Sequence, residues 1–446
     1  MFQFETNILR ELADDALKYG ASLGATAMVA EISENAGLHV TVRRQAVETV
    51  EQTRDKSFSL TAYVGDRRGN ASSSDFSMAS IRETVEAAIQ IARFTAPDTF
   101  AGLPAKRDLA VKVPELDLYH PWDLSTEQAI AIATEAEQAA LALGAEIGNT
   151  DGASVSSGAG QFVLANSLGF NNGYPYTRHS VSCSPIAVRG DDMQRDYWYA
   201  VDCNAARLPA AAALGDYAGR RSLARLAAQR LSTRRVPVLF EAPLACGLLG
   251  HVAQAASGSA LYRQSSFLEN GLGKALFSKH ISIDEDPHVV GNLGSAPFDG
   301  EGVKTRKRKV VDKGVLKGYF LSSYSARKLG MKTTGNAGGS HLLSFNSKLT
   351  KPSDDLRAML KKMDRGLFVT ELMGMGVNYV TGDYSRGAGG YWVENGEIQY
   401  PVEEITIAGN LKDMFMDVQA VGADVLQRGG KRSGSVLIGE MAIAGT

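Results

Sequence analysis

Residues 391–400 have the sequence Tyr-Trp-Val-Glu-Asn-Gly-Glu-Ile-Gln-Tyr, in which Asn395 and Gly396 separate two runs of strand-forming residues. Asn-Gly between such runs is a strong sign of a β-hairpin, because both residues tolerate the positive φ of a tight two-residue turn. The tripeptide at 312–314, Asp-Lys-Gly, predicts a second hairpin with a three-residue loop. The C-terminal part of the chain is therefore expected to consist largely of antiparallel strands.

Glycine is unevenly distributed over the 446 residues: 16 of the 46 glycines lie in residues 1–230 and 30 in residues 231–446. Glycine serves tight turns, bulges and close backbone contacts, so this excess predicts a turn-rich β domain over residues 231–446. Residues 1–230 have an ordinary glycine content and are expected to form a separate domain. We predict an α+β fold, in which an N-terminal mixed α/β domain precedes a C-terminal, mostly antiparallel domain with a barrel-like or curved sheet.

Helical spacing of apolar residues predicts helices over 6–19, 77–93, 126–143 and about 216–231 in the first half. Ser125 and Gln128 form a capping box at the start of the third of these helices. Strict alternation of apolar and polar residues over 58–64 predicts a strand, and residues 38–42 and 180–189 have a similar pattern.

In the second half we expect a strand over 236–240 that leads into a small-residue helix over 243–256. Two further helices are expected over 353–364 and 410–420, capped by Ser353 and Asn410.

Composition and charge exclude several classes of protein. Lys and Arg number 47 and Asp and Glu 49, so the net charge of −2 provides no general attraction for nucleic acid or an acidic membrane. Three cysteines are too few for a disulfide scaffold and suit a reducing compartment. The N-terminal sequence has no basic and apolar segments typical of a signal peptide, and no stretch is apolar enough to span a membrane. We expect a cytoplasmic protein.

One cluster of metal-ligating residue types lies within nine residues: His280, Asp284, Glu285, Asp286 and His288. It lacks the short ligand pairs that are typical of metal sites, such as HxxxH on one helical face or CxxC. We therefore favour an exposed loop with a solvated acidic run over a metal site.

Residues 304–309, Lys-Thr-Arg-Lys-Arg-Lys, are almost entirely basic. No aromatic residue is interleaved to stack on bases, which argues against nucleic-acid binding. We expect a solvated edge strand, since lysines discourage edge-to-edge pairing, with docking to an acidic partner as the alternative.

Two glycine clusters, at 335–339 and 387–390, lie outside any strand–loop–helix context of the kind that binds phosphate. Their simplest interpretation is β-hairpin turns.

Several long segments of the second half carry a family resemblance. The segments are 266–268 (SFL), 272–274 (LGK), 297–302 (PFDGEG), 324–330 (YSARKLG), 333–339 (TTGNAGG), 376–388 (GVNYVTGDYSRGA) and 400–411 (YPVEEITIAGNL). Together they resemble the TldD/PmbA family, also called modulators of DNA gyrase, and within it the PmbA-type (TldE-type) subunits. The resemblance extends over the whole chain and is densest from about 236 to 411.

This resemblance implies a cytoplasmic heterodimeric zinc protease made of paralogous TldD-type and TldE-type chains. Such pairs process peptides and flexible segments, including peptide-antibiotic precursors and the antitoxin of an addiction module. The TldD-type chain carries zinc on HExxxH, in the helix after the first strand of its C-terminal domain, with a further cysteine ligand near its end.

In this sequence the resemblance puts the six HExxxH positions on residues 250–255. Gly250 and Ala255 replace the two histidine ligands, His251 replaces the general-base glutamate, and Gln254 lies between them. No cysteine follows Cys246. Hydrolysis by zinc needs about three protein ligands and a base, so we expect this chain to hold no metal and to have no catalytic residue of its own.

The leading hypothesis is a non-catalytic subunit that docks a TldD-type, zinc-carrying partner and holds an extended peptide, with a homodimer as a possibility when the partner is absent. Glycine lets a substrate backbone approach closely, which gives the candidates for the peptide or partner groove: Gly335, Asn336, Gly338, Gly339, Gly387, Gly389 and Gly390. Two alternatives remain: a self-sufficient hydrolase with a non-zinc site that uses His251, and a regulatory binding protein that acts on a gyrase-linked target.

Overall fold

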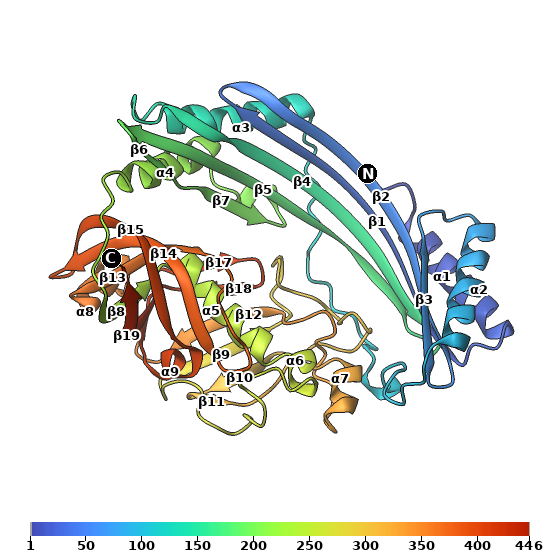
Figure 1. The fold of residues 1–446 in the computed structure, drawn as a ribbon. Helices are drawn as coiled ribbons and strands as arrows, with labels where there is room; N and C mark the ends of the chain where they lie inside the picture. The colour runs from blue at the N-terminus through green and yellow to red at the C-terminus, as the bar shows by residue number, and fades with distance from the viewer. Residues whose placement is uncertain (1, 446) are drawn as a thin grey trace.

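A long curved sheet forms the N-terminal part of the computed structural model, which describes residues 2–445 (Figure 1). Its strands follow the order β3-β2-β1-β4-β5-β6, and β7 also pairs with β5. All of these pairings are antiparallel. The strands are β1 (Ala27–Arg43), β2 (Ala46–Val64), β3 (Arg67–Ser73), β4 (Asn149–Asn166), β5 (Asn171–Arg189), β6 (Asp192–Arg195) and β7 (Trp198–Asp202).

Two pairs of helices cover opposite ends of this sheet (Figure 1). Helices α1 (Thr6–Ser22) and α2 (Met78–Phe94) bury Leu9 and Ile81 against Phe58 of β2. Helices α3 (Thr126–Leu141) and α4 (Ala211–Ala224) form a second, alanine-rich core against the other end of the sheet. Short 3₁₀ turns occur at Lys106–Asp108 and Ala205–Arg207.

The C-terminal part contains a closed five-stranded barrel with the strand order β15-β14-β13-β8-β19, completed by pairing between β15 and β19. A short strand, β16 (Val418–Val421), extends this sheet from β19. The barrel strands are β8 (Arg234–Phe240), β13 (Gly366–Met373), β14 (Asp383–Glu394), β15 (Glu397–Asn410) and β19 (Val436–Ala444).

A second C-terminal sheet has the strand order β11-β10-β9-β12-β18-β17. Its strands are β9 (Ile281–Asp286), β10 (Arg308–Asp312), β11 (Val315–Leu316), β12 (Leu342–Ser347), β17 (Leu426–Arg428) and β18 (Lys431–Ser433). Helix α5 (Ala242–Ala255) shares one core with the barrel and this sheet, through Val252, Ile407 and Leu343. The remaining helices are α6 (Gly258–Tyr262), α7 (Ser323–Lys328), α8 (Leu356–Met363) and α9 (Leu411–Met416).

The predicted fold class is confirmed, with a mixed α/β first part and a β-rich second part that contains a barrel. The capping box of Ser125 and Gln128 is present. Both predicted hairpin turns use positive φ, at Asn395 (54°) and Gly396 (73°) in one and at Lys313 (50°) and Gly314 (78°) in the other.

Helix ends were predicted less well. Helix α4 begins at Ala211, several residues earlier than expected, and ends at Ala224. The cap of α8 is Asp355 rather than Ser353, because the Asp355 carboxylate accepts a hydrogen bond from the backbone N–H of Ala358. Asn410 caps α9 as predicted.

The prediction of an exposed acidic loop at 280–288 was wrong. Residues 281–286 form β9, an inner strand between β10 and β12, and the Glu285 side chain is almost fully buried. The basic run was also misplaced, because only its last two residues enter a strand, β10, and that strand lies between β9 and β11. Its charges are partly neutralised by ion pairs of Lys307 with Asp286 and of Arg308 with Glu285.

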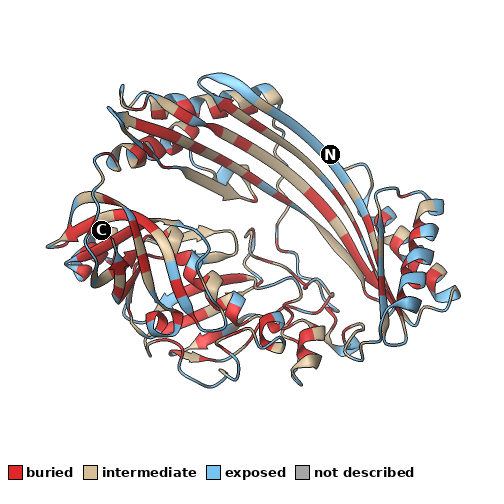
Figure 2. Ribbon diagram, in the orientation of Figure 1, coloured by how far each residue is buried: buried red, intermediate tan, exposed pale blue. Residues whose placement is uncertain are grey.

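The burial of residues follows the arrangement of the helices and sheets (Figure 2). The first half of β2 is exposed along most of its length, whereas its second half alternates between buried and half-buried residues. In residues 2–445, no helix has both the length and the apolar composition to cross a membrane.

Candidate functional site

Three cavities follow one another along α5 and the loop at residues 335–340. The first, about 300 Å³, lies between residues 196–199 and the start of α5. The second, about 580 Å³, lies between α5 and residues 336–340. The third, about 550 Å³, lies between residues 337–341 and strands β1, β4 and β5.

Adjacent cavities share lining residues, so we describe the three together as the groove. Gly250 and Lys431 border both the first and the second cavity. Residues 337–340 border both the second and the third. The groove therefore extends from the start of β7, past α5, to strands β1, β4 and β5.

Small and uncharged residues form the side of α5 that faces the groove. Gly247, Gly250, Ala253 and Gln254 border the cavities, at the three- and four-residue spacing of one helical face. A Cβ atom at Gly250 would lie 3.4 Å from Cε of Lys431, an ordinary contact distance, so the Lys431 side chain lies close to this face of the helix.

His251 points away from the groove, toward the 376–384 segment. Its Nδ1 lies 2.9 Å from the hydroxyl oxygen of Tyr379, and its ring meets that of Tyr384 edge-on at 5.8 Å. Burial, with a smaller contribution from the positive charge of Arg386, lowers the pKa of His251 to about 4. The imidazole is therefore neutral at physiological pH and is held as a packed, hydrogen-bonded group.

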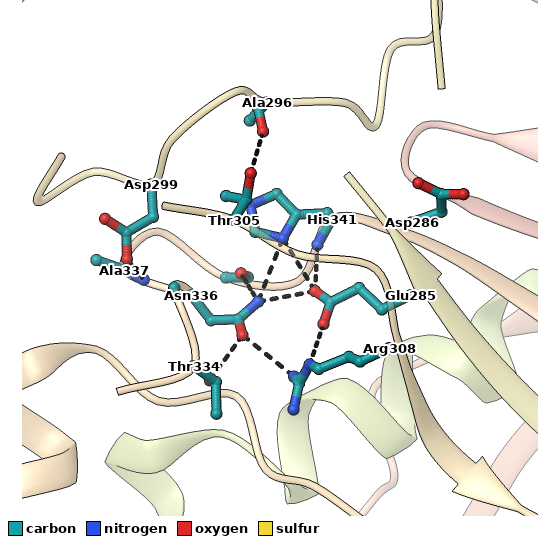
Figure 3. Close-up of polar contacts among 12 residues, drawn as sticks. Glu285, Asp286, Ala296, Asp299, Thr305, Arg308, Thr334, Asn336, Ala337 and His341 are labelled. Atoms are coloured by element: carbon teal, nitrogen blue, oxygen red, sulfur yellow. Dashed lines mark hydrogen bonds and ion pairs between the residues drawn. The ribbon is translucent and has the colours of Figure 1, made fainter. Parts of the chain in front are cut away.

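The buried carboxylate of Glu285 anchors the loop at 335–340 through hydrogen bonds (Figure 3). Oε1 of Glu285 accepts hydrogen bonds from Nδ2 of Asn336 (2.7 Å) and from the backbone N–H of His341 (2.9 Å), and it lies 3.0 Å from Nδ1 of His341. Oε2 accepts from Nε of Arg308 (2.7 Å). Burial alone would raise the pKa of Glu285, but the contacts with His341 and Arg308 outweigh it and lower the pKa to about 2.

A second carboxylate holds the middle of the same loop. Asp299 accepts backbone hydrogen bonds from Ala337, Glu301 and Val303, each at 2.9 Å. Burial raises the pKa of Asp299 to about 6, against the effect of these three donors. Between the two anchored ends, Gly338 (φ 100°) and Gly339 (φ 121°) are exposed and border the groove.

The structure separates the two predicted glycine clusters. Asn336, Gly338 and Gly339 border the groove, whereas Gly335 is buried and borders none of the three cavities. The cluster is part of an irregular loop, so the hairpin interpretation was wrong for it.

The second cluster, at 387–390, lies inside barrel strand β14 rather than in a hairpin turn. Gly389 and Gly390 are buried there, and a Cβ atom at Gly390 would lie 2.0 Å from the carbonyl oxygen of Phe368. Gly387, Gly389 and Gly390 border none of the three cavities, and the close approach to the Phe368 carbonyl at Gly390 shows that this glycine serves the packing of the barrel.

Comparison with known proteins gives matches along most of the chain. Residues 233–445 match the PmbA/TldA metallopeptidase C-terminal domain, residues 119–226 the central domain and residues 30–92 domain 1 of that family. The chain belongs to the PmbA/TldD metallopeptidase family. The metalloprotease PmbA of Escherichia coli O157:H7 is 46% identical, over 99% of this chain and 97% of its own length. A PmbA homologue from Haemophilus influenzae is 44% identical over 98% and 96%.

Solved structures of PmbA/TldD-like proteins have the same fold. A candidate modulator of DNA gyrase from Bacteroides thetaiotaomicron superimposes with a TM-score of 0.92 at 26% identity, over 98% of this chain and 99% of that chain. TldE from Thermococcus kodakarensis superimposes with a TM-score of 0.81 at 17% identity, over 97% and 100%.

The residues of α5 do not fit the zinc site that a metallopeptidase family implies. Gly250 and Ala255 offer no ligand atom, Gln254 has a neutral amide, and the imidazole of His251 is engaged with Tyr379. Zinc in catalytic sites is held by about three nitrogen, sulfur or oxygen ligands around one open position. Within residues 2–445, no group of three or more His, Cys, Asp or Glu residues is arranged to hold a metal ion.

Sequence reasoning missed the residues that shape the groove from the opposite side. Arg428 and Lys431 flank Gly429 and Gly430 in the turn between β17 and β18, and both border the first cavity. The aromatic run Tyr197, Trp198 and Tyr199 borders the same cavity. Three consecutive aromatic residues were the available signal, but nothing in the sequence indicated which cations they would meet.

Proposed function

We propose that this chain is a non-catalytic, TldE-type subunit of a two-chain zinc metalloprotease. In this proposal a TldD-type partner carries HExxxH and the zinc ion, while this chain helps to enclose the peptide and keeps it extended. The pair would process peptides and flexible protein segments, as in peptide-antibiotic maturation and antitoxin degradation.

The observation that carries the proposal is the set of side chains that α5 offers as possible zinc ligands. This helix follows the first strand of the C-terminal part, and in it Gly250 and Ala255 stand at the two expected ligand positions. The one imidazole nearby, that of His251, faces Tyr379 rather than the groove. A chain with this helix lacks both the ligands and the positioned base that zinc hydrolysis requires.

The groove supports a role in holding peptide. Exposed backbone at Gly338 and Gly339 separates the second cavity from the third, and neither residue has a side chain to obstruct a bound strand. Main-chain hydrogen bonds to an extended peptide give affinity that depends little on its sequence. This suits a subunit that handles unfolded segments of many sequences.

Co-purification with a paralogue from the same organism tests the proposal. The tagged chain should capture an HExxxH-bearing chain, and the pair should contain zinc and cleave unfolded β-casein in a chelator-sensitive way. The isolated chain should do neither, and size-exclusion chromatography would show whether it forms a homodimer alone. Stoichiometric zinc together with chelator-sensitive cleavage by the isolated chain would overturn the proposal.

A further inference from the structure

The first cavity contains a guanidinium that lies close to two aromatic rings. The Arg428 guanidinium lies 4.6 Å from the ring centre of Trp198 and 4.0 Å from that of Tyr199. Its Nη1 donates a hydrogen bond to the carbonyl oxygen of Tyr199 at 3.1 Å. These contacts hold the guanidinium in place, while its other N–H groups have no hydrogen-bond partner among residues 2–445.

The carboxylates of this cavity are already paired with another residue. Arg221 forms ion pairs with Glu241 (2.6 Å) and with Asp196 (3.2 Å). Across the described part of the chain, Arg428 and Lys431 form no ion pair with any carboxylate. Three cations and two carboxylates border the cavity, which leaves an excess of one positive charge.

One further feature of the cavity attracts an anion. Helix α5 begins at this cavity without a side-chain cap, and its first-turn residues Pro243 and Leu244 border the space. The partial positive charge of the helix N-terminus therefore adds to that of the two cations that form no ion pair among residues 2–445.

We propose that the first cavity binds the carboxylate of a peptide held in the groove, with Arg428 and Lys431 as the cationic partners. Guanidinium groups match carboxylates with two parallel hydrogen bonds, and a lysine adds a flexible point charge. The cavity, at about 300 Å³, is at the lower end of ligand-site volumes and suits one residue rather than a long segment. Tyr197, which is 54% exposed, offers an apolar surface to the neighbouring side chain.

The inference rests on the proposed peptide groove but adds a defined anchor at one end of it. A carboxylate can come from the C-terminus of a peptide or from an aspartate or glutamate side chain. Both sources present the same planar group, which only accepts hydrogen bonds, so the chemistry of the cavity suits either of them.

Fluorescence anisotropy on the full chain tests the inference with fluorescein-labelled tetrapeptides. The probes are Ala-Ala-Ala-Leu as free acid, the same peptide as C-terminal amide, and Ala-Ala-Ala-Glu as amide. The free acid should bind at least about tenfold more tightly than the leucine amide, since a charge-assisted hydrogen bond is lost. Binding of the glutamate amide like the free acid would identify the side chain as a competent source, and binding like the leucine amide would restrict the site to peptide termini.

Single substitutions then test whether the carboxylate of the probe binds at the first cavity. Lys431→Gln should weaken free-acid binding about tenfold, while Arg432→Gln, which removes the same charge from the exposed neighbour on β18, should change it less than about twofold.

The outcomes separate this inference from the proposed function. Equal binding of acid and amide, or equal weakening by the two β18 variants, overturns the carboxylate site and leaves the peptide groove standing. Failure of every probe to bind overturns the peptide groove and the carboxylate site together.

Discussion

The guanidinium of Arg221, on α4, donates two hydrogen bonds to the carboxylate of Glu241, the residue just before α5, at 2.6 and 3.1 Å. This buried ion pair joins the helix layer of the N-terminal sheet to the helix that borders the groove. Burial opposes the charge of Arg221, but the attraction of Glu241 outweighs it and raises the pKa of Arg221. The geometry of the first cavity therefore depends on a contact between the two parts of the chain.

Replacement of Arg221 by Met should lower the free energy of unfolding by about 3–5 kcal/mol, because it leaves the Glu241 carboxylate buried without its partner. The control is the adjacent residue in α4: Arg220→Gln removes an exposed pair with Asp216 and should cost less than about 0.5 kcal/mol. Urea denaturation followed by circular dichroism measures both. Similar small losses for the two variants would contradict a structural role for the Arg221 pair.

The Glu285 carboxylate should be the main anchor of the groove loop. Glu285→Gln should cost about 3–5 kcal/mol, since it leaves Arg308 without its buried counter-ion, and should make the 335–340 loop sensitive to limited proteolysis. Asp284→Asn, on the neighbouring half-exposed position of β9, should have little effect. Unchanged proteolysis of the loop in the Glu285 variant would show that Asp299 holds it alone.

Acid should destabilise the protein in part through His251. The pKa of His251 falls from 6.5 to about 4 on folding, so below pH 6.5 the unfolded chain binds a proton that the folded chain does not. Stability is therefore lost as the pH falls from about 6.5 toward 4. His251→Gln should flatten this part of the curve of melting temperature against pH, and nitrogen NMR should show a neutral His251 ring at about pH 5.

The His251→Gln variant also tests whether His251 takes part in peptide hydrolysis. His251→Gln should leave the peptidase activity of the complex within about twofold of the wild type, since the imidazole faces Tyr379 and not the groove. A large loss of turnover with an unchanged KM, in a variant that still binds its partner, would instead favour the hydrolase alternative.

Two glycines should respond in opposite ways to alanine. Gly390→Ala should disrupt the barrel, because its Cβ would lie 2.0 Å from the carbonyl oxygen of Phe368 and backbone would have to move. Gly247→Ala adds a methyl group on an exposed helix position with open space around it, and should stabilise the chain by up to about 1 kcal/mol. Thermal denaturation compares the two variants, and a stable Gly390→Ala protein would refute the packing role of this glycine.

Local patterns in the sequence predicted local structure well. The capping box at Ser125 and the turn at Asn395 and Gly396 depend on neighbours in the chain, and both are present. The length of the N-terminal strands was missed, because the first half of β2 is polar and exposed and has no alternating pattern. That half of β2 is ordered by its pairing with β1. Such a contact between two strands leaves no pattern within either strand alone.

The candidate site was only partly predictable for the same reason. Gly250 and His251 could be found from their place in one helix, and Gly338 and Gly339 from a glycine cluster. Glu285 was interpreted as a solvated acid, because its partners Arg308 and His341 lie 23 and 56 residues further along the chain. Burial of a charged residue depends on such distant partners, and sequence spacing does not reveal them.

Closure of the barrel sets an order of events during translation. Strand β8 pairs with β19, and β15 also closes onto β19, although roughly 200 residues separate β8 from β19. At about 5–20 residues per second, a ribosome needs roughly 10–40 s to make that interval, during which one edge of β8 has no partner strand. The nascent barrel therefore stays open until β19 has been made, and until then the unpaired edge of β8 is available for pairing with other strands.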